Sequence, residues 1–67
     1  MWYASYDSAH WSFEACGSTK IGAEAALILG LCRHGRQYNL DRKWFDPGDI
    51  VARRIEPGKC YRDYESI

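Results

Sequence analysis

The strongest constraint on this chain is one apolar segment, GAEAALILGLC at residues 22–32, in a sequence of only 67 residues. The Ser-Thr pair just before it offers a side-chain oxygen to the first free amide groups of a helix. We expect a helix from about Lys20 to His34 that ends at Gly35, because glycine accepts the left-handed conformation of a helix end. A helix on one small sheet normally shows a polar face to water, and this one does not. Its uncovered side therefore raises the question of a binding partner.

Two faces of this helix can be separated at about 100° per residue. The face that we expect to cover the sheet is centred on Ile21, and its other members are Ala25, Ile28, Leu29, Leu31 and Cys32. The opposite face combines small residues with one leucine, namely Ala23, Ala26, Leu27 and Gly30. Alanine is the best helix former and is common on exposed faces, but a glycine in mid-helix costs about 1 kcal/mol relative to alanine. We therefore weigh two hypotheses, an ordinary exposed face and a face that packs on a second copy or on a partner protein.

Two aromatic segments precede the helix, WYASY at residues 2–6 and WSFEA at residues 11–15. In the second segment Trp11, Phe13 and Ala15 alternate with polar residues, which is the period of a β-strand. An Asp-Ser pair between the two segments suits a turn. The pattern predicts an antiparallel hairpin.

Two Pro-Gly sequences divide the second half, DPGD at residues 46–49 and EPGK at 56–59, and each predicts a type II turn. The β-branched segment IVARRI between them predicts a strand over residues 50–55, and residues 59–64 can add a last short strand with open pairing. Adjacent Arg53 and Arg54 interrupt the alternation. Either a bulge occurs there, or Arg53 lies beside Val51 with its stem packed flat.

These elements predict an α+β fold for a single domain over residues 1–67. One helix packs on a small antiparallel sheet that is made of the hairpin and one or two further strands. A composition with 46% hydrophobic and 15% aromatic residues indicates a folded core.

The cysteines and the amino terminus indicate a reduced compartment. Cys16, Cys32 and Cys60 are odd in number and lack a close pair, which argues against a disulfide framework. The amino terminus has no basic segment followed by an apolar one, and no run reaches the roughly 18 apolar residues of a membrane span. We expect a cytoplasmic protein that has no membrane partner.

We find no motif typical of an enzyme. Cys32 and His34 could serve as nucleophile and base, but residues two apart on a helix point about 200° away from each other. The cysteines and histidines lack the spacing of structural zinc sites, and the glycines match neither the P-loop nor the dinucleotide fingerprint. We expect no catalysis, no metal and no cofactor.

Basic residues gather in the second half, although nine bases and nine acids give a net charge of zero. Residues 33–62 carry eight bases against four acids. Between them stand Tyr38, Trp44, Phe45, Tyr61 and Tyr64. Such a mixture suits phosphate contacts and base stacking, and it equally suits protein interfaces, where arginine, tryptophan and tyrosine dominate binding. The acids among the bases are also typical of an ordinary salt-paired surface.

The order of the segments WYASY, WSFEACG, the alanine-rich helix after Gly-Ser-Thr and the closing DIVARRIEPGKCYRD resembles the small proteins encoded by phages and mobile elements. Anti-CRISPR proteins are the best-known functional class among these. The resemblance covers most of the chain in size and layout and transfers no functional residue. It implies an inhibitor in the host cell cytoplasm that occupies a functional surface of a host protein complex, such as a Cas effector.

We therefore expect a non-catalytic binding protein. The residues expected to contact the partner are Arg33, Arg36, Arg42, Lys43, Trp44, Arg53 and Arg54. One alternative is a nucleic-acid-binding accessory protein that uses the same residues. Another is a small subunit, for example of a homodimer, that assembles through the helix face formed by Ala23, Ala26, Leu27 and Gly30.

Overall fold

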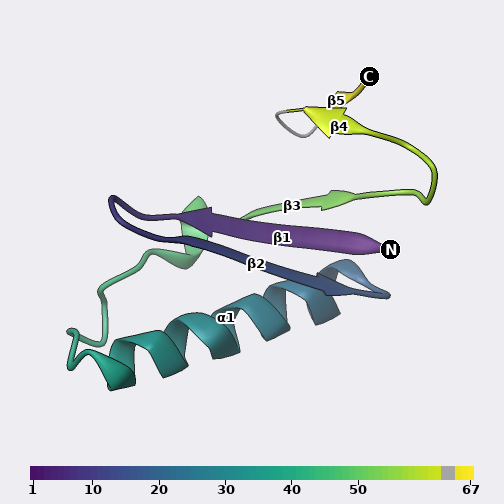
Figure 1. Cartoon of the computed structure of the whole chain (residues 1–67). Helices are drawn as coiled ribbons and strands as arrows, with labels where there is room; N and C mark the ends of the chain where they lie inside the picture. Colours follow the sequence, from purple (N-terminus) through teal and green to yellow (C-terminus); the bar gives the residue numbers. More distant parts are fainter. Residues whose placement is uncertain (63–64) are drawn as a thin grey trace.

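The computed structural model describes residues 1–62 and 65–67. Along this part of the chain the elements are β1 (Trp2–Asp7), β2 (Ser12–Gly17), α1 (Lys20–Gln37), the 3₁₀ helix η1 (Pro47–Asp49), β3 (Val51–Arg54), β4 (Tyr61–Arg62) and β5 (Glu65–Ser66). The first three strands form an antiparallel sheet in the order β2-β1-β3, and α1 packs on one of its faces (Figure 1). β4 and β5 pair with each other in a second, two-stranded sheet. The predicted α+β fold is confirmed.

The predicted hairpin is confirmed, and its strands extend further than expected. The pairing of β1 with β2 runs from Trp2 opposite Gly17 to Asp7 opposite Ser12. The turn is closed by the Ser8 amide, which donates to the carbonyl oxygen of Trp11 at 2.8 Å. This pairing fixes which strand residues share a face, because neighbouring residues of a strand point to opposite sides.

β3 pairs with the other edge of β1 without a bulge. Trp2 lies opposite Arg54 and Tyr3 opposite Arg53, in a one-to-one register. Arg53 therefore shares a face with Val51, as the second of the two alternatives predicted. Its guanidinium carbon lies 5.3 Å from the ring centre of Tyr61, so the side chain packs against the neighbouring sheet.

The face of α1 that covers the sheet agrees with the predicted one only in part, since Leu31 is fully buried as expected but other predicted residues are not. The buried residues of α1 are spaced four apart, and they are Ala23, Leu27, Leu31 and Gly35. Ile21, the predicted centre of the covered face, is 79% exposed, and Leu29 is 50% exposed. The prediction is wrong by about a third of a turn. Because the helix is apolar on nearly all sides, the spacing of its apolar residues does not indicate one buried face. The fit of the helix to the sheet therefore decides which face is buried.

The start of α1 agrees with the sequence pattern, and its end does not. The Gly22 amide donates to Thr19 Oγ1 at 3.0 Å, which confirms the expected cap. The helix runs on through Gly35, so the prediction that this glycine ends it is wrong. Asn39 takes the left-handed conformation instead, with φ of 55°, and the Leu40 amide donates back to the Gly35 carbonyl oxygen at 2.8 Å. This is a Schellman-type end in which asparagine replaces glycine.

The two Pro-Gly sequences adopt different structures. Residues 46–49 were predicted as a type II turn and instead form η1, because Asp46 Oδ1 accepts the Gly48 amide at 2.8 Å and stabilises a 3₁₀ turn. Gly58 has a φ of 79°, the conformation that the second sequence predicts. The last strand predicted over residues 59–64 is in fact β4, which pairs with β5. Asp63 and Tyr64 lie outside the described residues.

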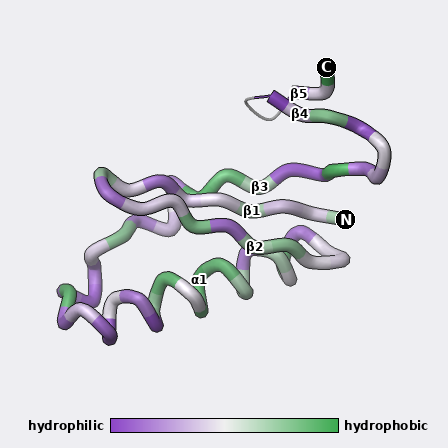
Figure 2. Tube along the Cα trace, viewed as in Figure 1, coloured by the Kyte–Doolittle hydropathy of each residue, from purple (hydrophilic) through white to green (hydrophobic). Residues whose placement is uncertain are grey.

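Hydropathy differs along α1 (Figure 2). Most of its length carries hydrophobic residues, whereas its C-terminal end and the loop that follows are mainly hydrophilic. The C-terminal end of α1 and the loop after it therefore form one hydrophilic region of the molecule.

Candidate functional site

A cluster of aromatic rings holds the C-terminal end of α1 against the hairpin turn. The ring centre of His34 lies 4.7 Å from that of Tyr38, 4.9 Å from Phe13 and 5.3 Å from both Trp11 and Trp44. These residues come from the helix, the hairpin and the loop after the helix. The three segments are thus fixed relative to one another by ring contacts, each worth roughly 0.5–1.5 kcal/mol beyond its buried area.

Trp44 returns the loop after α1 to the helix. Its Nε1 donates to the carbonyl oxygen of Leu31 at 3.3 Å, and its ring meets Tyr6 edge-on at 6.0 Å. A Cβ atom on Gly35 would lie only 2.7 Å from this Nε1. Because it lacks a Cβ atom, Gly35 allows Trp44 to pack closely against α1.

A hollow of about 540 Å³ lies between the last turns of α1 and this loop. It combines two arginines with apolar and aromatic surface, and its lining residues are Cys32, Gly35, Arg36, Asn39, Leu40, Asp41, Arg42, Trp44 and Phe45. Trp44 and Phe45 are half-buried and Leu40 is exposed. The volume falls in the range of about 300–1,000 Å³ that is typical of ligand sites.

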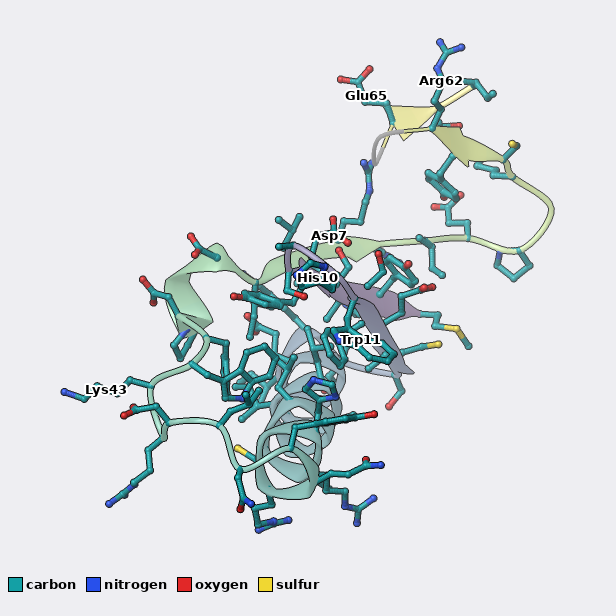
Figure 3. The ribbon with its side chains drawn as sticks, turned by 60° about the vertical axis from the view of Figure 1, so that its left-hand side comes forward. Asp7, His10, Trp11, Lys43, Arg62 and Glu65 are labelled. Atoms are coloured by element: carbon teal, nitrogen blue, oxygen red, sulfur yellow. The ribbon has the colours of Figure 1, made fainter. Side chains whose placement is uncertain are left out.

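Four exposed cations stand at and around the hollow, and we call them the basic end: Arg33, Arg36, Arg42 and Lys43. Among residues 1–62 and 65–67 none of the four takes part in a salt bridge. The Lys43 side chain projects away from the body of the molecule (Figure 3). The basic end thus presents charge that the described part of the chain leaves uncompensated by direct ion pairs.

The acids of the same loop are used in local turns. Asp41 Oδ1 accepts the backbone amide of Lys43 at 2.8 Å, and Asp46 Oδ1 accepts that of Gly48 at 2.8 Å. A carboxylate that accepts a backbone amide is held close to its own turn. These acids shape the loop and lower the net charge around the hollow without pairing with its arginines.

The structure brings together five of the predicted partner-binding residues and separates the other two. Arg36, Arg42 and Trp44 line the hollow, Lys43 stands between Arg42 and Trp44 in the chain, and Arg33 lies about one helical turn before Arg36. Arg53 and Arg54 pair with the start of β1, whereas α1 ends beside the hairpin turn. The length of β1 between these points is about 17 Å at the rise of a strand. Arg53 and Arg54 therefore do not belong to the same surface.

The predicted assembly face of the helix is also corrected. Ala23 is fully buried and Leu27 is 2% exposed, so both contact the chain's own sheet and neither is open to a partner. Ala26 and Gly30 are exposed. The exposed apolar side of α1 is the one that we expected to be covered, with Ile21 and Leu29 among its residues.

The structure places the two residues considered for catalysis, Cys32 and His34, in different surroundings. His34 lies among the aromatic rings, while Cys32 is exposed and lines the hollow. In the described residues no group of three or more histidine, cysteine, aspartate or glutamate side chains is placed to hold a metal ion. The same part of the chain contains no helix with the length and apolar character needed to cross a membrane.

Sequence reasoning missed three residues of this region. Trp11 belongs to the hairpin yet contacts the end of the helix, and Asn39 and Leu40 line the hollow. The signal for Asn39 was present, since asparagine is the residue after glycine that most readily ends a helix. No local pattern marks the contact of Trp11, because it joins segments more than 20 positions apart.

The chain matches no protein-family description, and comparisons with curated proteins and with solved structures give no match either.

Proposed function

We propose that this chain is a small non-catalytic binding protein that inhibits a host protein complex by occupying one of its surfaces with the basic end. The observation that carries the proposal is the gathering of Arg33, Arg36, Arg42 and Lys43, without salt bridges in the described residues, around a hollow with aromatic lining. Arginine beside exposed aromatic and apolar residues is the composition that dominates binding at protein interfaces. An acidic protein surface is the matching partner.

The arrangement favours protein over nucleic acid as the partner. Asp41 precedes the two bases of the loop, and Asp46 and Asp49 follow them, so the loop lacks the continuous positive surface that tracks a phosphate backbone. Trp44 is half-buried and meets Tyr6 and Phe45 edge-on, so its ring offers no open platform for a base. A sequence with zero net charge also lacks the general attraction that nucleic-acid binders use.

Two exposed aromatic rings support nucleic acid as the second candidate for the partner. Trp11 is 51% exposed and Tyr38 is 52% exposed, and their ring centres lie 6.0 Å apart near the basic end. Exposed aromatic rings beside arginines are what single-stranded nucleic acids stack on. The two rings are inclined at 41°, which leaves them poorly placed to hold one base between them.

The test is capture of partners from a lysate of the source cells by the tagged protein, with and without nuclease. The variant to compare is Arg36→Glu with Arg42→Glu, which reverses two charges of the basic end. A matched control is Lys20→Glu with Arg62→Glu, which changes the net charge equally at exposed positions outside the basic end.

We expect one stoichiometric protein complex that survives nuclease, is lost with the basic-end variant and is retained with the control. Recovery that disappears with nuclease would instead assign the basic end to nucleic acid. Equal recovery by both charge variants would contradict the proposal, since binding would then not depend on the basic end.

A further inference from the structure

The side chains that line the hollow beside α1 indicate which kind of partner segment it binds. This inference rests on the proposed function. We propose that the hollow receives an acidic segment of the partner protein in which a carboxylate side chain stands next to an aromatic or large apolar one. The carboxylate would bind between Arg36 and Arg42, and the apolar side chain would pack on Phe45 and Leu40.

The apolar part of the hollow has room for such a side chain. Leu40 is 41% exposed, and Phe45 is half-buried with its ring edge-on to Tyr6 at 6.0 Å. Trp44, whose Nε1 is bonded to the Leu31 carbonyl oxygen, forms a fixed part of the wall. A volume of about 540 Å³ holds a few side chains and is too small for a whole secondary-structure element.

The two arginines reach the hollow from different elements. Arg36 stands on the last turns of α1, and Arg42 stands on the loop that Trp44 holds in place. Neither forms a salt bridge in the part of the chain that the structure describes. A guanidinium group binds a carboxylate through two parallel hydrogen bonds, which fixes the direction of approach as well as the charge of the partner.

The apolar lining favours a protein segment over a nucleic acid. Asp41 also lines the hollow, and its carboxylate remains there because it accepts the Lys43 amide at 2.8 Å. The charged groups of the lining are thus two guanidinium groups and one carboxylate, which attract a single anionic group. A phosphodiester and a carboxylate each carry one negative charge, but the apolar wall formed by Leu40 and Phe45 suits the side chain of an acidic protein segment.

The experiment is a titration of the isotope-labelled full chain with three probes, followed by NMR. The first probe is the capped peptide Glu-Phe-Glu, the second is its neutral isostere Gln-Phe-Gln, and the third is a hexathymidylate. The signal to follow is the indole N–H of Trp44, together with the backbone amides of residues 36–42. Probe concentrations up to about 5 mM detect the millimolar affinity expected of so short a peptide.

We expect the acidic peptide to shift these signals in a saturable way and the neutral peptide to bind at least about tenfold more weakly. The variant Arg36→Gln should weaken the acidic peptide by a similar factor. The matched control is Arg62→Gln, which removes the same group at an exposed position of β4, outside the basic end. It should leave the affinity nearly unchanged, and the amide spectra of both variants report whether they are folded.

Three outcomes would overturn the inference: equal binding of the acidic and neutral peptides, no shift at the highest concentration, or shifts at the hollow with the hexathymidylate alone. Failure of the proposed function would look different. If partner capture depends on Arg33 and Lys43 while Arg36→Gln with Arg42→Gln leaves it intact, the basic end binds a protein and the hollow does not. If neither pair affects capture, the proposed function itself fails.

Discussion

The two ends of this molecule are built differently. At the C-terminal end of α1, rings from three segments surround His34, and Trp44 bonds to the helix backbone. At the other end β4 and β5 have two residues each, and two of their described contacts join β4 to the segment around β3: Arg53 with the ring of Tyr61, and the Glu56 amide with Tyr61 Oη at 2.9 Å. The backbone that carries the basic end is thus held by ring contacts before a partner arrives, which lowers the backbone entropy lost on binding. Among the described residues, the β4–β5 end shows no comparable cluster of rings.

The charges at the two ends differ as well. Lys59 and Glu56 form a salt bridge of 3.0 Å at the β4–β5 end, between side chains that are each about half exposed. Hydrogen bonding and attraction by Lys59 lower the pKa of Glu56, and the same contact raises the pKa of Lys59. The cations of the basic end have no such partner in the described residues. Charge that the described residues leave without ion pairs therefore lies at the end that is held by ring contacts.

The largest effect that we predict concerns the support of the basic end. Leu31 is fully buried, and its backbone carbonyl oxygen accepts the hydrogen bond of Trp44. Leu31→Ala removes the buried side chain and should lower the free energy of unfolding by about 2–5 kcal/mol. Urea denaturation followed by circular dichroism measures the change. Leu29→Ala is the control, because Leu29 is half exposed on the other side of α1, and it should cost less than about 1 kcal/mol. Similar losses from both variants would show that α1 does not pack as described.

The second effect concerns the close approach of Trp44 to the helix. Gly35→Ala should lower the free energy of unfolding by about 1–3 kcal/mol, because the new Cβ would lie 2.7 Å from Trp44 Nε1. The indole N–H signal of Trp44 should shift in the NMR spectrum of the same variant.

Gly30→Ala is the matched control for that substitution. Its Cβ would meet nothing within 4 Å, so the helix propensity of alanine should raise the free energy of unfolding by up to about 1 kcal/mol. If the two substitutions change the free energy of unfolding in opposite directions, the contrast between the covered and open sides of α1 is confirmed. Equal gains in stability would mean that Trp44 does not pack on Gly35.

The third prediction tests how weakly the β4–β5 end is attached. Tyr61→Ala removes the ring under Arg53 and the acceptor for the Glu56 amide, and it should lower the free energy of unfolding by about 1 kcal/mol. Tyr61→Phe keeps the ring and should restore part of the loss. A cost as large as that of Leu31→Ala would break the comparison between the two ends.

The smallest effect concerns the pair of Glu56 and Lys59. Because the pKa of Glu56 is lowered in the folded state, its contribution is present above the unfolded pKa and is lost as the pH falls through the folded one. Both side chains are open to solvent, so water and salt screen the pair. Glu56→Gln should leave the melting temperature unchanged within error at about 0.15 M salt, at pH 7 and at pH 3. A clear drop at pH 7 alone would show that the pair stabilises this end more than its exposure suggests.

Local sequence signals predicted most of the elements. The alternation at Phe13 and Ala15 gave the hairpin, Thr19 marked the start of α1, and Gly58 marked the second turn. These signals depend on a few neighbouring residues, so they predict a helix, strand or turn without information on how the elements pack. The signal failed at Gly48, where the side chain of Asp46 bonds the amide and a 3₁₀ turn replaces the type II turn.

The candidate site was predicted in part. The proximity of Arg36 and Arg42 to the end of the helix follows from the sequence, since only a few residues separate each of them from it. That Arg53 and Arg54 lie elsewhere follows only from the register of β3 on β1. The positions of the basic residues in the sequence do not show which of them share a surface.

The sequence by itself determined the α+β class, the order of the elements and the concentration of positive charge after residue 32. Tertiary structure alone decided which side of α1 is buried, since Ile21 and Leu27 are equally apolar to a local pattern and differ only in what the sheet can cover. It also decided that Gly35 is required and Gly30 is not, because the difference lies in the contact with Trp44. The physical reason is that helix and turn signals are local, whereas packing depends on residues that the chain brings together from distant positions.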